Sequence, residues 1–311
     1  MTGADDFATA RVAIARVPML RDLDAAALGI RRLGGLTNLV FRIQTGAEDY
    51  CLRVPGKGTD AYIDRSVEAF NARVAAAAGV SPEVLHFGND GIMVTRFLGG
   101  CVTMTSTSLC TTAGAPARVG RVFRELHQCG QAFEFRFGLF AMIDSYLAHL
   151  KQLGLRLPDG YHETVAEAEV VREALSAHPL PLAPCHCDPL SENFLDDGRR
   201  MWMVDWEYSG MNDPMWDLGD LSVEAGFGAA QDLEMLAAYF DGPARPADFG
   251  RMVIYKAMCD LLWTLWGLIQ HANHNPVDDF WAYSVNRLVR CQARMATPAF
   301  ATHLAAIRAG T

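Results

Sequence analysis

The stretch HCDPLSENFL at residues 186–195, followed by VDWE at residues 204–207, holds the densest group of polar side chains in the chain. Three of these side chains, Asp188, Asn193 and Asp205, fall on loops that border two predicted short strands. One carboxylate can orient or deprotonate an attacking hydroxyl group, while an amide oxygen and a second carboxylate can hold magnesium ions that bridge nucleotide phosphates. The spacing therefore predicts phosphoryl transfer, with two solvated acidic turns as the alternative.

The pattern HxDxxxxN, followed by a hydrophobic strand and Asp205, resembles the catalytic and metal-binding loops of the kinase-like phosphotransferases. That superfamily includes the aminoglycoside phosphotransferases and the choline kinases. The string VDWEYSGMNDPMWDL at residues 204–218 is similar to the choline/ethanolamine kinases in particular, and the resemblance extends from about residue 32 to about residue 290. It implies that Asp188 is the catalytic base or the residue that positions the hydroxyl group, and that Asn193 and Asp205 are Mg²⁺ ligands.

Four neighbouring residues are expected to support these groups without taking part in the chemistry. His186 is expected to brace the catalytic loop, and Asp213 and Asp217 to cap or brace the segment after Asp205. His127 belongs to the FRELH stretch at residues 123–127, which resembles a packing element of the same superfamily, and no chemistry is assigned to it.

The N-terminal third of the chain predicts a compact α+β lobe. An opening helix runs to about Leu28, and the later elements are two strands in a hairpin, a helix and two more strands, at residues 39–43, 50–54, 63–78, 84–87 and 92–97. After a connection at residues 103–117 the chain is mostly helical, with one helix expected at 162–177 and two short strands between 182 and 205. The resemblance implies a two-lobed protein-kinase-like fold of the α+β class: a nucleotide-binding lobe with a small antiparallel sheet (1–98) and a larger, mainly helical catalytic and acceptor-binding lobe (99–311).

A glycine-containing loop between strands is the first candidate for binding ATP, because its backbone N–H groups can approach phosphate oxygens. The loop resembles the short glycine, serine/threonine and asparagine loop of choline kinases. The resemblance also implies that Arg53 binds phosphate oxygens at the position where most kinases have a lysine, and that Arg53 forms an ion pair with Glu68. The alternative is that Arg53 and Glu68 are two unrelated surface charges. The connection at residues 92–100 is expected to receive the adenine edge. The predicted ATP-binding residues are Gly34, Gly35, Thr37, Asn38, Arg53, Glu68, Thr95 and Phe97.

A second group of residues indicates the acceptor. A quaternary ammonium is recognised by aromatic faces together with a carboxylate. Trp263 and Trp266 share one face of a predicted helix, although a tryptophan pair at this spacing is also common in cores. By resemblance, these aromatic positions line a choline pocket. The predicted acceptor-binding residues are Glu207, Tyr208, Glu224, Trp263, Trp266 and Tyr283.

Composition restricts the partners and the location. The 311 residues carry a formal net charge of −9, which argues against nucleic acid or an anionic membrane as the main partner. The N-terminus lacks the features of a signal peptide, and the apolar run at residues 261–269 is too short to span a bilayer. Eight cysteines form no CxxC pair, and the CHC segment at 185–187 has no second ligand pair for structural zinc. We expect a cytoplasmic protein with free thiols.

The leading hypothesis is an ATP- and Mg²⁺-dependent kinase that converts choline to phosphocholine and ADP, with ethanolamine as a second acceptor. Thiamine or an aminoglycoside as acceptor is the enzymatic alternative, and the aromatic set favours the small cation. A nucleotide-binding scaffold without turnover is the third hypothesis, against which the joint presence of Asp188, Asn193 and Asp205 speaks. The acceptor, the number of Mg²⁺ ions, the downstream pathway and the oligomeric state, with a homodimer as one alternative, stay open.

Overall fold

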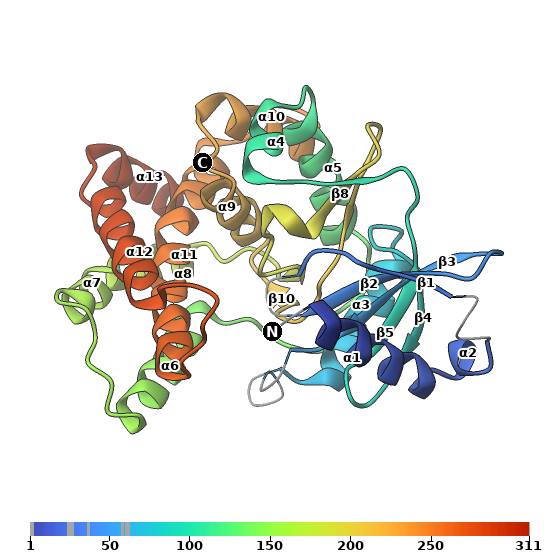
Figure 1. Cartoon of the computed structure of the whole chain (residues 1–311). Coiled ribbons are helices and arrows are strands. Elements are labelled where there is room, and N and C mark those ends of the chain that lie inside the picture. The colour runs from blue at the N-terminus through green and yellow to red at the C-terminus, as the bar shows by residue number, and fades with distance from the viewer. Residues whose placement is uncertain (1–2, 24–27, 36–37, 57–58, 60–62, 311) are drawn as a thin grey trace.

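The structure is a computed structural model that describes residues 3–23, 28–35, 38–56, 59 and 63–310. Its first part is a five-stranded antiparallel sheet in the order β1-β2-β3-β5-β4, with helices around it (Figure 1). These elements are α1 (Gly3–Arg16), α2 (Pro18–Arg21), β1 (Gly29–Arg32), β2 (Leu39–Gln44), β3 (Asp49–Val54), α3 (Arg65–Ala77), β4 (Val84–Phe87) and β5 (Met93–Arg96).

Alternation of side chains along the strands builds a small core of its own. Phe41, Ile43 and Leu52 are fully buried on the face of the sheet that α1 covers. Ala10 and Ala13 of α1 pack into the same cluster, so small residues let the helix approach the sheet closely. The predicted hairpin at 39–54 is confirmed, with Leu39 opposite Val54 and Gln44 opposite Asp49.

Two predicted helices of the first hundred residues differ in detail from the structure. The predicted single opening helix is two helices, because Pro18 cannot donate a backbone hydrogen bond and begins α2. Helix α3 is confirmed and begins at Arg65 after the N-cap Asp64, whose carboxylate accepts hydrogen bonds from the N–H groups of Ser66 (2.9 Å) and Val67 (3.3 Å).

The second part of the chain is mainly helical, which confirms the predicted α+β class. Its helices are α4 (Ser106–Thr111), α5 (Ala115–His127), α6 (Leu139–Gln152), α7 (Tyr161–Glu167), α8 (Glu169–Ala177), α9 (Met215–Glu224), α10 (Ala229–Phe240), α11 (Pro246–Ala272), α12 (Phe280–Met295) and α13 (Pro298–Ala309). Its strands are β6 (Val102–Thr103), β7 (Ala183–Cys185), β8 (Phe194–Asp196), β9 (Met201–Met203) and β10 (Gly210–Asn212), paired as β6-β8-β9 and β10-β7.

Three local predictions for this part are corrected. The helix expected at 162–177 is broken at Ala168, which ends α7 and caps α8. The region 182–205 holds three strands and a 3₁₀ turn rather than two strands, because β7 leaves to pair with β10. The stretch 103–117 is not a plain connection, since β6 pairs with β8 and Thr105 caps α4.

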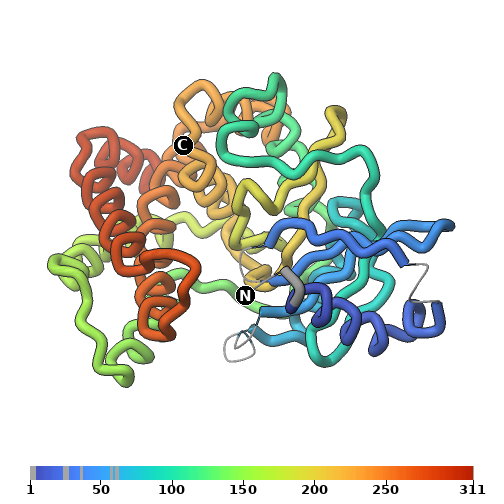
Figure 2. The backbone as a smooth tube through the Cα atoms, in the orientation of Figure 1, coloured from blue at the N-terminus to red at the C-terminus, as the bar shows by residue number. Residues whose placement is uncertain are grey.

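Helix α11 is the centre of the helical region. It packs against α6, α9, α12 and α13, and the backbone trace in Figure 2 shows the red C-terminal helices gathered on the side away from the sheet. By length and composition this 27-residue helix could cross a membrane, but 89% of its apolar window is buried inside the protein. That burial is typical of the core helix of a globular protein.

Candidate active site

The loop that follows β7 is held in place by a carboxylate from α9. The backbone N–H groups of His186 and Cys187 donate to the two oxygens of Asp217, at 2.7 and 2.8 Å. Cys187 has a φ of 66°, so the chain turns sharply just before Asp188. His186 adds a contact between its Nε2 and the carbonyl oxygen of Val204 (2.9 Å), which links the loop to the segment before Asp205. The predicted bracing roles of Asp217 and His186 are therefore confirmed.

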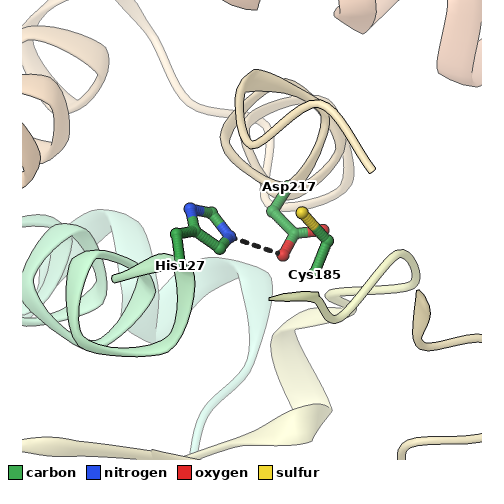
Figure 3. Close-up of side chains that lie close together, drawn as sticks. All are labelled: His127, Cys185 and Asp217. Carbon is green, nitrogen blue, oxygen red and sulfur yellow. Dashed lines mark hydrogen bonds and ion pairs between the residues drawn. The ribbon is translucent and has the colours of Figure 1, made fainter. Parts of the chain in front are cut away.

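Figure 3 shows how Asp217 is itself fixed by His127, with Cys185 beside them. His127 Nε2 lies 3.0 Å from Asp217 Oδ2, and its Nδ1 lies 3.0 Å from the hydroxyl oxygen of Tyr239. These three residue types could form a metal site, but both ring nitrogens already have hydrogen-bond partners. We interpret this buried cluster as a structural support that holds the catalytic loop in position.

The three oxygen-bearing side chains predicted for chemistry lie on adjoining segments. Asn193 lies at the end of the 3₁₀ turn, and its side-chain Nδ2 donates to the main-chain carbonyl oxygen of Asp188 (3.1 Å). The main-chain carbonyl oxygen of Asn193 accepts a hydrogen bond from the N–H of Val204 (3.0 Å). The first of these bonds uses the amide nitrogen, the atom that cannot bind a metal ion, and so fixes the orientation of the amide oxygen. Asp205 follows directly, with a φ of 71° that is rare for a residue with a side chain and is found at functional sites.

Burial, with crowding of carboxylates as the second cause, dominates the electrostatics of this site. Burial, together with the nearby carboxylates of Asp205 and Glu224, raises the pKa of Asp188 to about 8. Burial and the neighbouring Glu207 raise the pKa of Asp205 to about 7, against the opposing effect of Arg53. A divalent cation would relieve this repulsion, and carboxylate and amide oxygens are the hard ligands that Mg²⁺ prefers. Asn193 and Asp205 therefore fit the predicted metal site.

On the side of the sheet, buried arginines and glutamates form a network next to Asp205. Arg53 pairs with Glu68, as predicted, and its Nη1 lies 3.4 Å from Asp205 Oδ1. The sequence interpretation missed Arg65, whose Nη1 lies 2.7 Å from Glu68 and also 2.7 Å from Glu207. The spacing of three residues between Arg65 and Glu68 on one helix was the signal that could have found it.

Glu207, which was predicted to bind the acceptor, forms ion pairs with two arginines. Its described contacts are with Arg65 (2.7 Å) and Arg53 (3.7 Å), both from the first part of the chain. The contact with Arg65 joins α3 to the segment that carries Asp205. Its predicted part in binding the acceptor has no support from these contacts.

The predicted glycine loop joins β1 to β2. Gly35 has a φ of 120°, and a Cβ atom there would lie 2.2 Å from the carbonyl oxygen of Asn38, so the loop requires glycine at this position. Asn38 donates from Nδ2 to Asp205 Oδ2 (3.4 Å), which brings the loop to the metal aspartate. Thr37 lies outside the described residues.

The two residues predicted for the adenine edge lie at the end of β5. Thr95 is buried and pairs with Cys51 of β3, and the N–H of Phe97 donates to the carbonyl oxygen of Asp49 (3.1 Å). The Arg42 guanidinium lies 4.5 Å from the centre of the Phe97 ring. Their contact with adenine stays a prediction.

The predicted aromatic residues form one cluster, in which burial, helped by the nearby carboxylate of Asp188, raises the pKa of Tyr283. The ring centroids of Tyr208 and Trp263 lie 5.5 Å apart, and those of Trp263 and Trp266 lie 6.5 Å apart. Trp266 Nε1 donates to the Tyr208 hydroxyl (3.0 Å), and its ring centroid is 6.0 Å from that of Tyr283. Phe280, which the sequence interpretation missed, completes the cluster at 5.6 Å from Trp266.

Glu224 borders the aromatic cluster and forms an ion pair within the protein. One of its oxygens lies 2.6 Å from Nη2 of Arg287, another residue that the sequence interpretation missed. The guanidinium of Arg287 is 4.6 Å from the centre of the Tyr283 ring and also contacts the buried Asp260 (3.3 Å). The spacing of four residues between Tyr283 and Arg287 on α12 was the signal for this contact.

Comparison with known proteins gives consistent results. The sequence model of the phosphotransferase enzyme family matches residues 29–247. A crystal structure of a choline/ethanolamine kinase family protein from Mesorhizobium loti is 60% identical, with a TM-score of 0.90, and the match covers 98% of this chain and 100% of that one. The choline kinase LicA from Streptococcus pneumoniae is 27% identical, with a TM-score of 0.72 and coverage of 87% and 94%. Ethanolamine kinase 1 from Mus musculus is 25% identical over 300 residues, with coverage of 81% and 80%.

Proposed function

The chain belongs to the phosphotransferase enzyme family and within it to the choline/ethanolamine kinases, and we propose that it transfers the terminal phosphoryl group of ATP to the hydroxyl group of choline, with ethanolamine as a second acceptor. The observation that carries this proposal is the position of Asp188. It lies within electrostatic reach of Asp205, beside the arginine network, and also of Glu224 and Tyr283, beside the aromatic cluster. A hydroxyl group held there would have the carboxylate on one side and a nucleotide on the other.

Asp188 would orient the acceptor hydroxyl and take its proton as the oxygen attacks the terminal phosphorus atom. The bond to the bridging oxygen of ADP breaks in the same reaction, so phosphocholine and ADP are the products. Hydrogen bonds from the backbone N–H groups of His186 and Cys187 to the Asp217 carboxylate keep the Asp188 side chain in one place. This matters because small displacements in an active site reduce the rate strongly.

Asn193 and Asp205 would hold Mg²⁺, which when bound neutralises charge on the nucleotide phosphates. Arg53 lies 3.4 Å from Asp205 and brings a fixed positive charge to the site. Its planar guanidinium can donate two parallel hydrogen bonds to phosphate oxygens. The ion pair with Glu68 fixes the orientation of the Arg53 guanidinium.

The aromatic cluster favours choline among the alternative acceptors. A trimethylammonium group cannot donate conventional hydrogen bonds and is attracted to the faces of Trp and Tyr rings. Trp263 and Trp266 offer such faces together with Tyr208 and Tyr283. Glu224 contributes a carboxylate at the edge of the cluster, which would also suit the smaller ammonium group of ethanolamine.

An ADP-release assay tests this function. The purified chain is incubated with ATP, Mg²⁺ and one acceptor at a time: choline, ethanolamine, thiamine or kanamycin. We expect the highest kcat/KM with choline, a lower value with ethanolamine, and no turnover above background with the other two. A preference for thiamine or kanamycin would refute choline as the acceptor but would still support a kinase activity. An absence of turnover with all four acceptors would favour the scaffold hypothesis.

A further inference from the structure

Arg32, the last residue of β1, holds the glycine loop together through main-chain oxygens. Its Nη1 donates to the carbonyl oxygens of Leu33 (2.9 Å), Val40 (3.0 Å) and Gly34. Its Nη2 reaches the carbonyl oxygen of Asn38 at 3.5 Å. One guanidinium therefore connects both ends of the loop, from Gly34 on one side to Asn38 on the other.

Helix α1 contacts the guanidinium of Arg32 through Asp6. Asp6 Oδ2 lies 3.4 Å from Nε of Arg32, and the two side chains are 22% and 25% exposed, so solvent screens the pair only in part. The helix itself is anchored, because Ala10 and Ala13 are buried against the sheet. Figure 1 shows α1 alongside the sheet, and the helix precedes the segment that matches the family, residues 29–247.

The contacts continue from the loop to the centre of the site. While Arg32 binds the main chain of Asn38, the side chain of Asn38 accepts from the N–H of Gly56 (3.1 Å) and donates to Asp205 (3.4 Å). An unbroken path of polar contacts thus joins Asp6 on the first helix to the aspartate that would hold Mg²⁺.

We propose that Arg32 is a positioning residue for the nucleotide, and that α1 takes part in nucleotide binding by holding Arg32 through Asp6. Ordering a glycine-containing loop costs conformational entropy. Arg32 fixes Gly34 and Asn38, the described ends of this loop, before the nucleotide arrives, so less of that entropy is lost on binding. The role favours arginine, since its planar fork spreads five N–H donors over three nitrogens that face both ends of the loop and Asp6, whereas a lysine ammonium donates three N–H groups from one point.

The test compares Arg32→Gln, Arg32→Lys and Asp6→Asn with the matched control Arg31→Gln. Arg31 is the preceding residue of β1, is exposed and points to the opposite face of the strand. The dissociation constant of ADP is measured by calorimetry without any acceptor, and the KM values of ATP and of the acceptor are measured separately. We expect Arg32→Gln to weaken ADP binding about 5- to 30-fold, Arg32→Lys to restore only part of the affinity, and Asp6→Asn to weaken it about two- to fourfold.

A positioning role requires that the KM of ATP rises while the KM of the acceptor stays within error, a separation that general destabilisation would not produce. The inference is overturned if Arg32→Gln binds ADP as the wild type does, if Arg31→Gln weakens binding equally, or if both KM values rise together. Should Arg32→Gln fail to fold, Arg32→Lys and Asp6→Asn decide the question by the same criteria. ADP binding is measured without acceptor, so a wrong acceptor assignment would leave this result untouched.

Discussion

The two sides of Asp188 are built from different chemistry. On the nucleotide side, Arg53 and Arg65 share the carboxylates of Glu68 and Glu207 in a network that is almost fully buried. On the proposed acceptor side aromatic rings pack against one another, and the ion pair between Glu224 and Arg287 lies at their border. Phosphate groups need cations in fixed directions, whereas a quaternary ammonium needs only polarisable faces.

This difference predicts different tolerance to change. Removing one partner from a buried ion network leaves another charge without compensation, which costs several kcal/mol. Removing one ring from a cluster of several rings weakens the attraction in part and leaves the others in place. Substitutions on the nucleotide side should therefore affect folding and catalysis together, and those on the acceptor side mainly the affinity for one substrate.

Asp188 is near both the arginine network and the aromatic cluster, and its substitution should have the largest effect on activity. We expect Asp188→Asn to lower kcat about 10²- to 10⁴-fold, because the amide cannot accept the hydroxyl proton. The affinity for ADP should stay within about twofold of the wild type, since the described partners of the nucleotide side are unchanged. Steady-state kinetics and calorimetry measure the two quantities, and a variant with near-normal kcat would refute the role of Asp188.

Glu68→Gln tests the ion network directly. The substitution leaves Arg53 and Arg65 buried with less compensating charge, so we expect the free energy of unfolding to fall by about 3 kcal/mol and ATP binding to weaken. The matched control is Glu83→Gln, which breaks an exposed pair with Arg96 and should change stability far less. Urea denaturation measures both. Equal effects of the two substitutions would mean that the buried network contributes no more than a surface pair.

Trp266→Ala tests the aromatic cluster. We expect the KM of choline to rise about 5- to 30-fold through loss of a cation–π contact and of the hydrogen bond to Tyr208, while the KM of ATP is unchanged. The control is Trp202→Ala on β9, where the ring stacks with Arg200 (4.1 Å) outside the cluster. An equal rise in both KM values would contradict an acceptor-specific role.

The same division explains what the sequence alone could predict. Asp188, Asn193 and Asp205 were singled out by their spacing, because the short loops that carry them lie next to the strands β7, β8 and β9. The aromatic cluster is found in part, since Trp263 and Trp266 share a helical face, but Phe280 joins it only through the packing of α12 against α11.

Contacts that depend on packing between distant segments escaped prediction. Glu207 was predicted to bind the acceptor, and its ion pair with Arg65 of α3 could not be foreseen from the sequence. Arg287 pairs with Glu224 across more than sixty residues, and no local pattern specifies such a pair. Tertiary contacts of this kind are decided by how helices dock, which single-sequence periodicity does not encode.

The smallest effect we predict concerns the crowded carboxylates between the two sides. The pKa values of Asp188 and Asp205 are raised to about 8 and about 7, above the value near 4 in the unfolded chain, so the folded state binds more protons. Stability should therefore fall as pH rises from about 4 to about 8. In EDTA, we expect this to lower the Tm of the wild type about 2–4 °C more than that of Asp188→Asn between pH 5 and pH 8, a modest difference because solvent screens the site in part. Mg²⁺ at pH 8 should reduce this difference in the fall of Tm. Identical dependence of Tm on pH in the two proteins would contradict a raised pKa of Asp188.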